Sequence, residues 1–151
     1  MTCSMDLLEI PIQILDEGLA TPGYAYPGDA GVDLRTTVDF ALAPFERMAV
    51  PTGIAVELPD GYAALVLPRS GLAAKHGISL VNSPGLIDSN YRGEIKAILV
   101  NLDPVETFQA KRGDRIAQLV ITRVESCVFA PRASLAESNR GASGFGSSGT
   151  M

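Results

Sequence analysis

The chain has 151 residues, a mass of 15.9 kDa and a formal net charge of −5 at pH 7, which favours one domain built on a single core. An acidic chain cannot be strongly basic on one face without acidic compensation elsewhere, so we expect no general affinity for nucleic acids. Its two cysteines, Cys3 and Cys127, lack motif spacing, which argues against a zinc site and a disulfide scaffold.

The N-terminal residues carry no recognisable targeting or membrane signal. They contain neither a basic region nor a long apolar segment, so we expect no signal peptide and no membrane span. A reducing, cytoplasmic compartment is the simplest expectation for a chain of this kind.

Short apolar runs recur between turn-forming residues along most of the chain. The runs lie at residues 7–15, 47–50, 53–58, 62–67, 78–81, 94–102 and 115–124. This spacing predicts an all-β, jelly-roll-like barrel or sandwich. Asp60-Gly61 separates two of the runs and predicts a hairpin between them.

One short helix is expected at residues 70–76, where Ser70 could cap the amides ahead of it and Gly77 could end the turn. The last residues, 138–151, are mostly small and polar and cannot form a core of their own. We therefore expect a β-barrel domain at residues 1–137, followed by a flexible glycine-rich tail of the same domain.

A second predicted hairpin carries a distinctive set of side chains. Its arms, residues 78–81 and 94–100, are rich in Ile, Val and Leu, as buried strands are. Asp88, Tyr91 and Arg92 stand in the turn between the arms and should project from a rigid frame. Such a frame suits the binding of a small polar ligand.

Three other connections carry polar groups that have more than one explanation. Residues 29–34 place two carboxylates around a glycine, for which a surface turn is the simpler interpretation. Residues 68–73 offer amides, a hydroxyl and a guanidinium, which suit a phosphate site and an ordinary helix cap equally well. Gln118 follows a turn in residues 112–119, and most such glutamines are simply exposed strand residues.

The tail segment 140–149 combines glycines with Arg140 and Phe145. Its glycines would let backbone amides approach an anion, while the phenylalanine ring could close over a base. The segment lacks the lysine of a P-loop, which argues against a Walker-type NTPase.

In their order and spacing, these segments resemble the five motifs of the homotrimeric dUTPases. The matching segments are DAGVDL (29–34), PRSGLA (68–73), NSPGLIDSNYRG (82–93), RGDRIAQL (112–119) and RGASGFGSSG (140–149). Ser143 stands where that family more often has glycine. The resemblance implies hydrolysis of dUTP to dUMP and pyrophosphate, which limits uracil in DNA and supplies dUMP for dTMP synthesis.

The resemblance also implies a role for each residue of the hairpin. Asp88 would be the general base that activates water for attack on the α-phosphorus, and it would accept a hydrogen bond from the sugar 3′-hydroxyl. Tyr91 would lie under the deoxyribose and exclude a 2′-hydroxyl. Uracil would pair with the hairpin backbone and with the side chain of Asn82. The backbone positions concerned are Leu86, Ile87 and Lys96.

The other motifs are implied to hold the phosphates, a metal ion and the closing tail. The phosphate-binding residues would be Arg69, Ser70, Gly71, Gln118 and Arg140. Mg²⁺ would be coordinated by the triphosphate and would contact Asp33 through water. Phe145 would stack on uracil, with Gly146 and Ser147 beside it in the tail, and each site would be shared between subunits of a homotrimer.

Three rival functions stay open beside this one. A dCTP deaminase has the same fold by family resemblance, although we expect a different pattern in place of PRSGLA at residues 68–73. A non-catalytic nucleotide-binding module would bind without releasing pyrophosphate, but the presence of Asp88 and a complete tail argues against it. A structural jelly roll would have no use for this set of polar loops.

Overall fold

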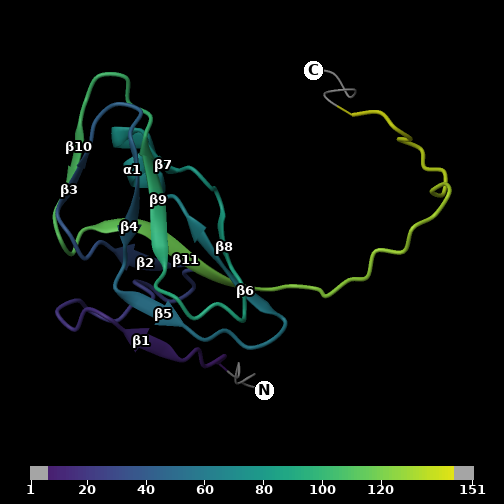
Figure 1. Cartoon of the computed structure of the whole chain (residues 1–151), viewed down its shortest axis with the longest axis horizontal. Coiled ribbons are helices and arrows are strands. Elements are labelled where there is room, and N and C mark those ends of the chain that lie inside the picture. Colours follow the sequence, from purple (N-terminus) through teal and green to yellow (C-terminus); the bar gives the residue numbers. More distant parts are fainter. Residues whose placement is uncertain (1–6, 145–151) are drawn as a thin grey trace.

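The computed structural model describes residues 7–144, which form a β-rich body and a long C-terminal extension (Figure 1). The elements in chain order are β1 (Ile12–Ile14), β2 (Val32–Arg35), β3 (Phe40–Leu42), β4 (Arg47–Pro51), β5 (Ile54–Val56), β6 (Tyr62–Leu67), α1 (Ser70–His76), β7 (Ile78–Leu80), β8 (Gly85–Ile87), β9 (Lys96–Asn101), β10 (Phe108–Ala110) and β11 (Arg115–Arg123). The prediction of an all-β, jelly-roll-like fold with one short helix is confirmed.

All strand pairs in the described residues are antiparallel. A four-stranded sheet has the order β2-β11-β6-β8, and a three-stranded sheet has the order β4-β9-β7. Two further pairs, β1-β5 and β10-β3, complete the body. Strands that follow one another in sequence therefore often lie in different sheets.

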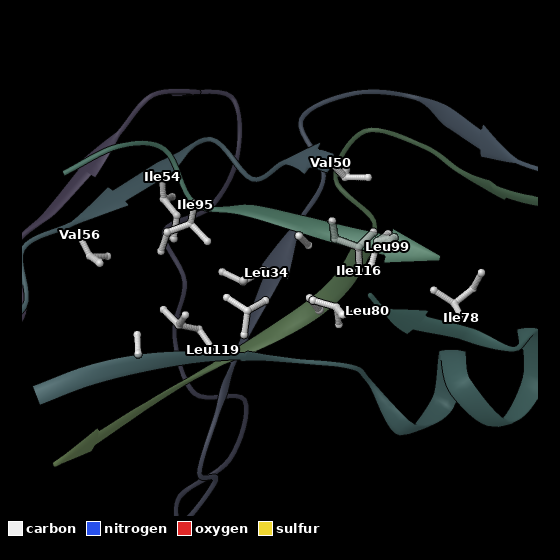
Figure 2. Packing of buried hydrophobic residues seen from close by; sticks show 14 of the residues in the cluster. Leu34, Val50, Ile54, Val56, Ile78, Leu80, Ile95, Leu99, Ile116 and Leu119 are labelled. Carbon is white, nitrogen blue, oxygen red and sulfur yellow. The ribbon is translucent and has the colours of Figure 1, made fainter. Parts of the chain in front are cut away.

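The core lies between these sheets and is almost entirely aliphatic. Figure 2 shows side chains from β2, β7, β9 and β11 directed into one interior, among them Leu34, Leu80, Leu99 and Leu119. Leu34 and Leu99 are no more than 1% exposed. Full burial of such a side chain contributes about 1.5–3 kcal/mol, so this cluster fixes the frame from which the polar loops project.

The hairpin predicted between residues 78–81 and 94–100 is confirmed in its arms, because β7 pairs with β9 and Leu80 lies opposite Leu99. Its connection is more than a turn, however. It contains β8, which leaves this sheet and pairs with β6, so that Gly85 lies opposite Val66. The strand β8 thereby fixes the backbone that leads directly into Asp88.

The hairpin predicted around Asp60-Gly61 is wrong. The turn itself forms, since Gly61 has a φ of 80° and the Tyr62 N–H donates to the Pro59 carbonyl at 3.2 Å. The strands on either side do not pair, because β5 joins β1 while β6 joins β11 and β8. All three residues of β5 are buried, so this strand packs inside the body instead of folding back on its neighbour in sequence.

The helix α1 begins and ends close to the predicted positions, but its cap differs. Arg69 occupies the N-cap position, no side chain bonds the free amides, and Ser70 is already the first helical residue. Gly77 ends the helix as predicted, with a φ of 64° and an N–H that donates to the Ala73 carbonyl at 3.1 Å. Left-handed backbone of this kind favours glycine.

The chain leaves the body after β11, and Figure 1 shows the following segment running away from the sheets. Residues 124–144 contain no helix or strand, and nearly all of them are exposed. Val128 and Phe129 are more than nine-tenths exposed. No helix within residues 7–144 has the length and apolar character needed to cross a membrane.

Candidate active site

Two arginines converge on one carboxylate at the end of the four-stranded sheet. Asp33 in β2 pairs with Arg69 Nε at 2.9 Å through Oδ1 and with Arg115 Nη1 at 3.3 Å through Oδ2. Arg69 also donates from Nη1 to the Arg115 carbonyl at 3.1 Å. The cluster of Asp33, Arg69 and Arg115 has one more positive than negative charge, and it stays partly exposed, so it can receive an anion.

Gln118 lies beside this cluster because β11 runs between β2 and β6. Its neighbours across the sheet are Asp33 on one side and Leu67 on the other, so all three side chains share one face. The Gln118 amide donates to the Pro68 carbonyl at 2.9 Å. A cavity of about 360 Å³ opens here, bordered by Asp33, Gln118 and Gly31 among others.

The start of α1 adds main-chain groups to the same region. Ser70 and Gly71 follow Arg69 directly and are exposed. A Cβ atom built on Gly71 would meet nothing within 4 Å, so this stretch of backbone lies open to a ligand. The arrangement agrees with the predicted grouping of Arg69, Ser70, Gly71 and Gln118.

The turn after β8 holds the second set of predicted site residues. Asp88 is exposed, and its carbonyl accepts from the Tyr91 N–H at 3.1 Å. Arg92 stabilises the turn by donating from Nη1 to the carbonyls of Ser89 at 2.6 Å and Tyr91 at 3.0 Å. The Asp88 carboxylate is thus free for chemistry while its backbone is held.

The positions predicted to bind uracil surround the same turn. Leu86 and Ile87 belong to β8, where Leu86 is exposed and Ile87 is half-buried against the core. Asn82 and Lys96 are exposed on either side, Asn82 two residues after β7 ends and Lys96 at the beginning of β9. Their backbone groups can therefore be reached by a ligand from outside the sheet.

The two sets of residues lie apart within one chain. Gln118 lies opposite Leu67 on one side of β6, whereas Ile87 lies opposite Ala64 on the other side. The two positions are three residues apart along the strand direction, which is about 10 Å, and two strand spacings apart across the sheet, which is also about 10 Å. Because these displacements are perpendicular, the two backbones are separated by about 14 Å. Asp88 lies still farther along, so a single chain does not bring Asp88 to the cluster around Asp33.

The described part of the tail is not placed against either set. Arg140 donates from Nε to the Ser143 carbonyl at 2.8 Å, within the tail itself, and Figure 1 shows this segment far from the body. The predicted residues Phe145, Gly146 and Ser147 lie outside the described residues.

Arg115 had no predicted role, although it forms an ion pair with Asp33 in the structure. Its place in the motif segment 112–119 was the one feature of the sequence that could have pointed to a role in the site. A register shift between Arg115 and Ala117 marks a bulge in β11, and this local irregularity turns Arg115 toward the same carboxylate that Arg69 binds.

The fold and these loops define an all-β protein with a surface site for a small anionic ligand. A family model described as dUTPase matches residues 18–149. The deoxyuridine 5′-triphosphate nucleotidohydrolase of Thermobifida fusca (strain YX) is 57% identical over 142 residues, covering 94% of this chain and 79% of that protein. The same-named protein of Streptomyces coelicolor is 58% identical over 142 residues, covering 94% and 78%.

The solved structures agree with these matches. A mutant dUTPase of Staphylococcus bacteriophage 80alpha with dUpNHpp is 25% identical, with a TM-score of 0.87 and coverage of 94% of this chain and 99% of that one. The chain therefore belongs to the dUTPase family.

Proposed function

We propose that this chain is a dUTP diphosphatase, a hydrolase of acid anhydrides that converts dUTP to dUMP and pyrophosphate. The observation that carries the proposal is the family match across residues 18–149, which include all five motifs in order. The reaction would limit uracil in DNA and supply dUMP for dTMP synthesis.

In this proposal Asp88 is the general base. Its exposed carboxylate takes a proton from a water molecule as that water attacks the α-phosphorus, and pyrophosphate leaves in line. No protein nucleophile is required. The hydrogen bonds that Arg92 and Tyr91 make to the backbone of this turn support the proposal, because a base must be held within reach of its water.

Substrate selection belongs to the same turn and the neighbouring strands. Asn82 and the backbone near Leu86, Ile87 and Lys96 would pair with uracil, and Tyr91 would exclude a 2′-hydroxyl. Cytosine would leave buried polar groups unpaired at a cost of roughly 1–3 kcal/mol each, while thymine would push a methyl group against the wall of the site.

The phosphates would bind Arg69, Ser70, Gly71 and Gln118, and Arg140 would close on the γ-phosphate. Hydrogen bonds to charged groups contribute about 1.5–3 kcal/mol each, enough for an acidic protein to hold a polyanion locally. Phe145, with Gly146 and Ser147, would then close over uracil and exclude water.

We propose that Mg²⁺ binds at this site together with the substrate. No cluster of three His, Cys, Asp or Glu side chains occurs in residues 7–144, so the described chain offers no cage of its own for a metal ion. Asp33, whose two oxygens already accept from arginines, suits contact with a water of the hydrated ion. Bound Mg²⁺ would neutralise charge on the triphosphate.

We further propose a homotrimer in which each site is shared between subunits. The separation of Asp88 from the cluster around Asp33 supports sharing, because one chain holds the two halves apart. The outer face of the four-stranded sheet supports association: Leu65, Leu67 and Val120 are half-buried there and Leu86 is 62% exposed. Apolar side chains on a sheet face suit contact with another subunit.

The direct test is pyrophosphate release from dUTP, dTTP, dCTP and UTP under matched conditions. We expect rapid release from dUTP and little from the other three. Release of ammonia from dCTP would instead favour the deaminase, and nucleotide binding without pyrophosphate would favour the non-catalytic module.

A further inference from the structure

The ring of Tyr91 is placed by two backbone groups that follow it in sequence. Its hydroxyl donates to the Glu94 carbonyl at 3.0 Å. The end of the ring also lies against the backbone of Gly93, where an added Cβ atom would come within 2.6 Å of Tyr91 Cζ and within 3.1 Å of Cε2, with the hydroxyl nearer still. Only a residue without a side chain allows this ring position.

We propose that the bare backbone at Gly93 and the Glu94 carbonyl together form the platform that sets sugar discrimination. Gly93 is a positioning residue: it touches no substrate and acts through the Tyr91 ring. The inference rests on the proposed function, in which that ring excludes a 2′-hydroxyl. The backbone of Gly93 and the Glu94 carbonyl explain why the Tyr91 ring lies where the sugar would bind.

A side chain at Gly93 should displace the ring and leave the fold intact. The φ of Gly93 lies outside the left-handed region, so alanine meets no backbone strain there. The atoms that it would strike are the far end of Tyr91, which is 43% exposed and has solvent to move into.

The platform itself is anchored to the core and cannot move away with the ring. Glu94 accepts from the Gly53 N–H through Oε1 at 3.0 Å. Ile95, which comes next, is fully buried, and its N–H donates to the Ile54 carbonyl at 2.9 Å. A clash at Gly93 is therefore relieved by movement of the ring and not by movement of the backbone that leads into β9.

The general base should keep its place when the ring moves. The turn that bears Asp88 is held through main-chain atoms, by the Tyr91 N–H on the Asp88 carbonyl and by Arg92 on the carbonyls of Ser89 and Tyr91. None of these contacts uses the phenol ring. Discrimination between dUTP and UTP should thus be separable from turnover.

The test compares kcat/KM for dUTP and UTP in the full chain and in Gly93→Ala. We expect the dUTP-to-UTP ratio to fall about tenfold or more, with a nearly unchanged melting temperature. The matched control is Gly23→Ala, where the new Cβ meets nothing within 4 Å and φ is again outside the left-handed region. That variant should keep the wild-type ratio.

A double-mutant cycle tests whether Gly93 acts through the ring. In a Tyr91→Ala background, Gly93→Ala should cause no further loss of discrimination. Tyr91→Phe keeps the ring but removes its hydrogen bond to the Glu94 carbonyl, and it should lower the dUTP-to-UTP ratio severalfold. This variant serves as the test if Gly93→Ala fails to fold. If Gly93→Ala folds and its dUTP-to-UTP ratio is unchanged, the inference is overturned. If Gly93→Ala does not fold, an unchanged ratio in Tyr91→Phe overturns it.

The two proposals fail in different ways. Wild-type protein that releases no pyrophosphate from dUTP would overturn the proposed function and this inference with it. Wild-type activity on dUTP with unaltered discrimination in the variants would overturn only the role of Gly93 and Glu94.

Discussion

Asp88 stands directly after β8, where the sheet fixes its backbone while its carboxylate remains exposed. We predict that Asp88→Asn keeps the melting temperature and most nucleotide binding but lowers kcat by about 10²–10⁴-fold, because an amide cannot take the proton of the water. Titration with a non-hydrolysable dUTP analogue and single-turnover kinetics would separate the two effects. Near-normal hydrolysis would remove Asp88 from the mechanism.

Asp33 forms ion pairs with Arg115 and with Arg69, which we assign to the phosphates. We predict that Asp33→Asn raises the Mg²⁺ concentration needed for half-maximal activity, since a neutral amide orients a metal-bound water less strongly than a carboxylate does. The free energy of unfolding should fall by less than about 1 kcal/mol, as expected for partly exposed ion pairs. Asp60→Asn is a suitable control, because Asp60 is exposed in the turn before β6 and lies outside the five motif segments.

The grouping of Asp33, Arg69 and Gln118 could be anticipated from the motifs, whereas the contact of Arg115 could not. In a regular strand, residues three apart point to opposite faces, so a strict alternation would separate Arg115 from Gln118. The bulge between Arg115 and Ala117 removes that conflict. Bulges depend on the partner strand, and no residue pattern within one strand specifies them.

At the scale of elements, two glycines with left-handed backbone allow a matched comparison. Gly61 has a φ of 80° and open space around it, whereas a Cβ on Gly77 would lie 3.0 Å from the Asp103 backbone nitrogen. We predict that Gly61→Ala costs about 1–2 kcal/mol through backbone strain and that Gly77→Ala costs more. Urea unfolding of both variants measures the difference, and equal losses would mean that the contact with Asp103 is easily relieved.

The loop before β11 is tied to two distant segments by carboxylates whose pKa values are lowered. The Arg112 side chain, bonded to Asp16 at 2.6 Å, lowers the pKa of that carboxyl most strongly. For Asp39, the main lowering comes from the Arg112 backbone N–H, followed by Lys111. These contacts help to set the position from which β11 begins.

These shifts predict the direction of acid sensitivity. A pKa lowered by folding stabilises the protein above the ordinary aspartate value of about 3.9, and this stabilisation is lost as the pH falls through the folded value. The melting temperature should therefore drop as the pH falls below about 4. Asp16→Asn should flatten this dependence, and an identical slope in both proteins would contradict the assignment.

The apolar runs predicted seven of the eleven strands in the described residues but not which strands pair, and the short strands β2, β3, β8 and β10 lie outside those runs. The arms at residues 78–81 and 94–100 do pair, because both place alternate side chains into the same core. The strands flanking Gly61 do not, since β5 is buried throughout and belongs with β1. A turn sequence specifies a local reversal of the chain, whereas pairing depends on where the apolar faces find the core.

At the scale of the whole molecule, the C-terminal segment adds exposed surface and no core. Residues 124–144 include Val128 and Phe129, both more than nine-tenths exposed. We predict that truncation before Arg140 leaves the melting temperature nearly unchanged and abolishes most dUTP hydrolysis, because the closing groups are lost. A large fall in melting temperature would show that the tail stabilises the body instead.

Sharing of sites between subunits was implied by the family resemblance alone, because no residue pattern states which copy of a chain completes a site. The structure adds a reason for it: Asp88 and the cluster around Asp33 lie at different places along β6. In the proposed homotrimer each half would need the other, so two defective chains should restore one another.

We therefore predict complementation between two inactive variants. One carries Asp88→Asn with an intact tail, and the other keeps Asp88 but is truncated before Arg140. After subunit exchange at equal amounts, up to about one quarter of the sites in a closed symmetric ring would combine a good Asp88 with a good tail, so activity should reappear on mixing. If native mass measurements confirm exchange and activity stays at the level of the separate variants, the tail and the base of each site come from the same chain.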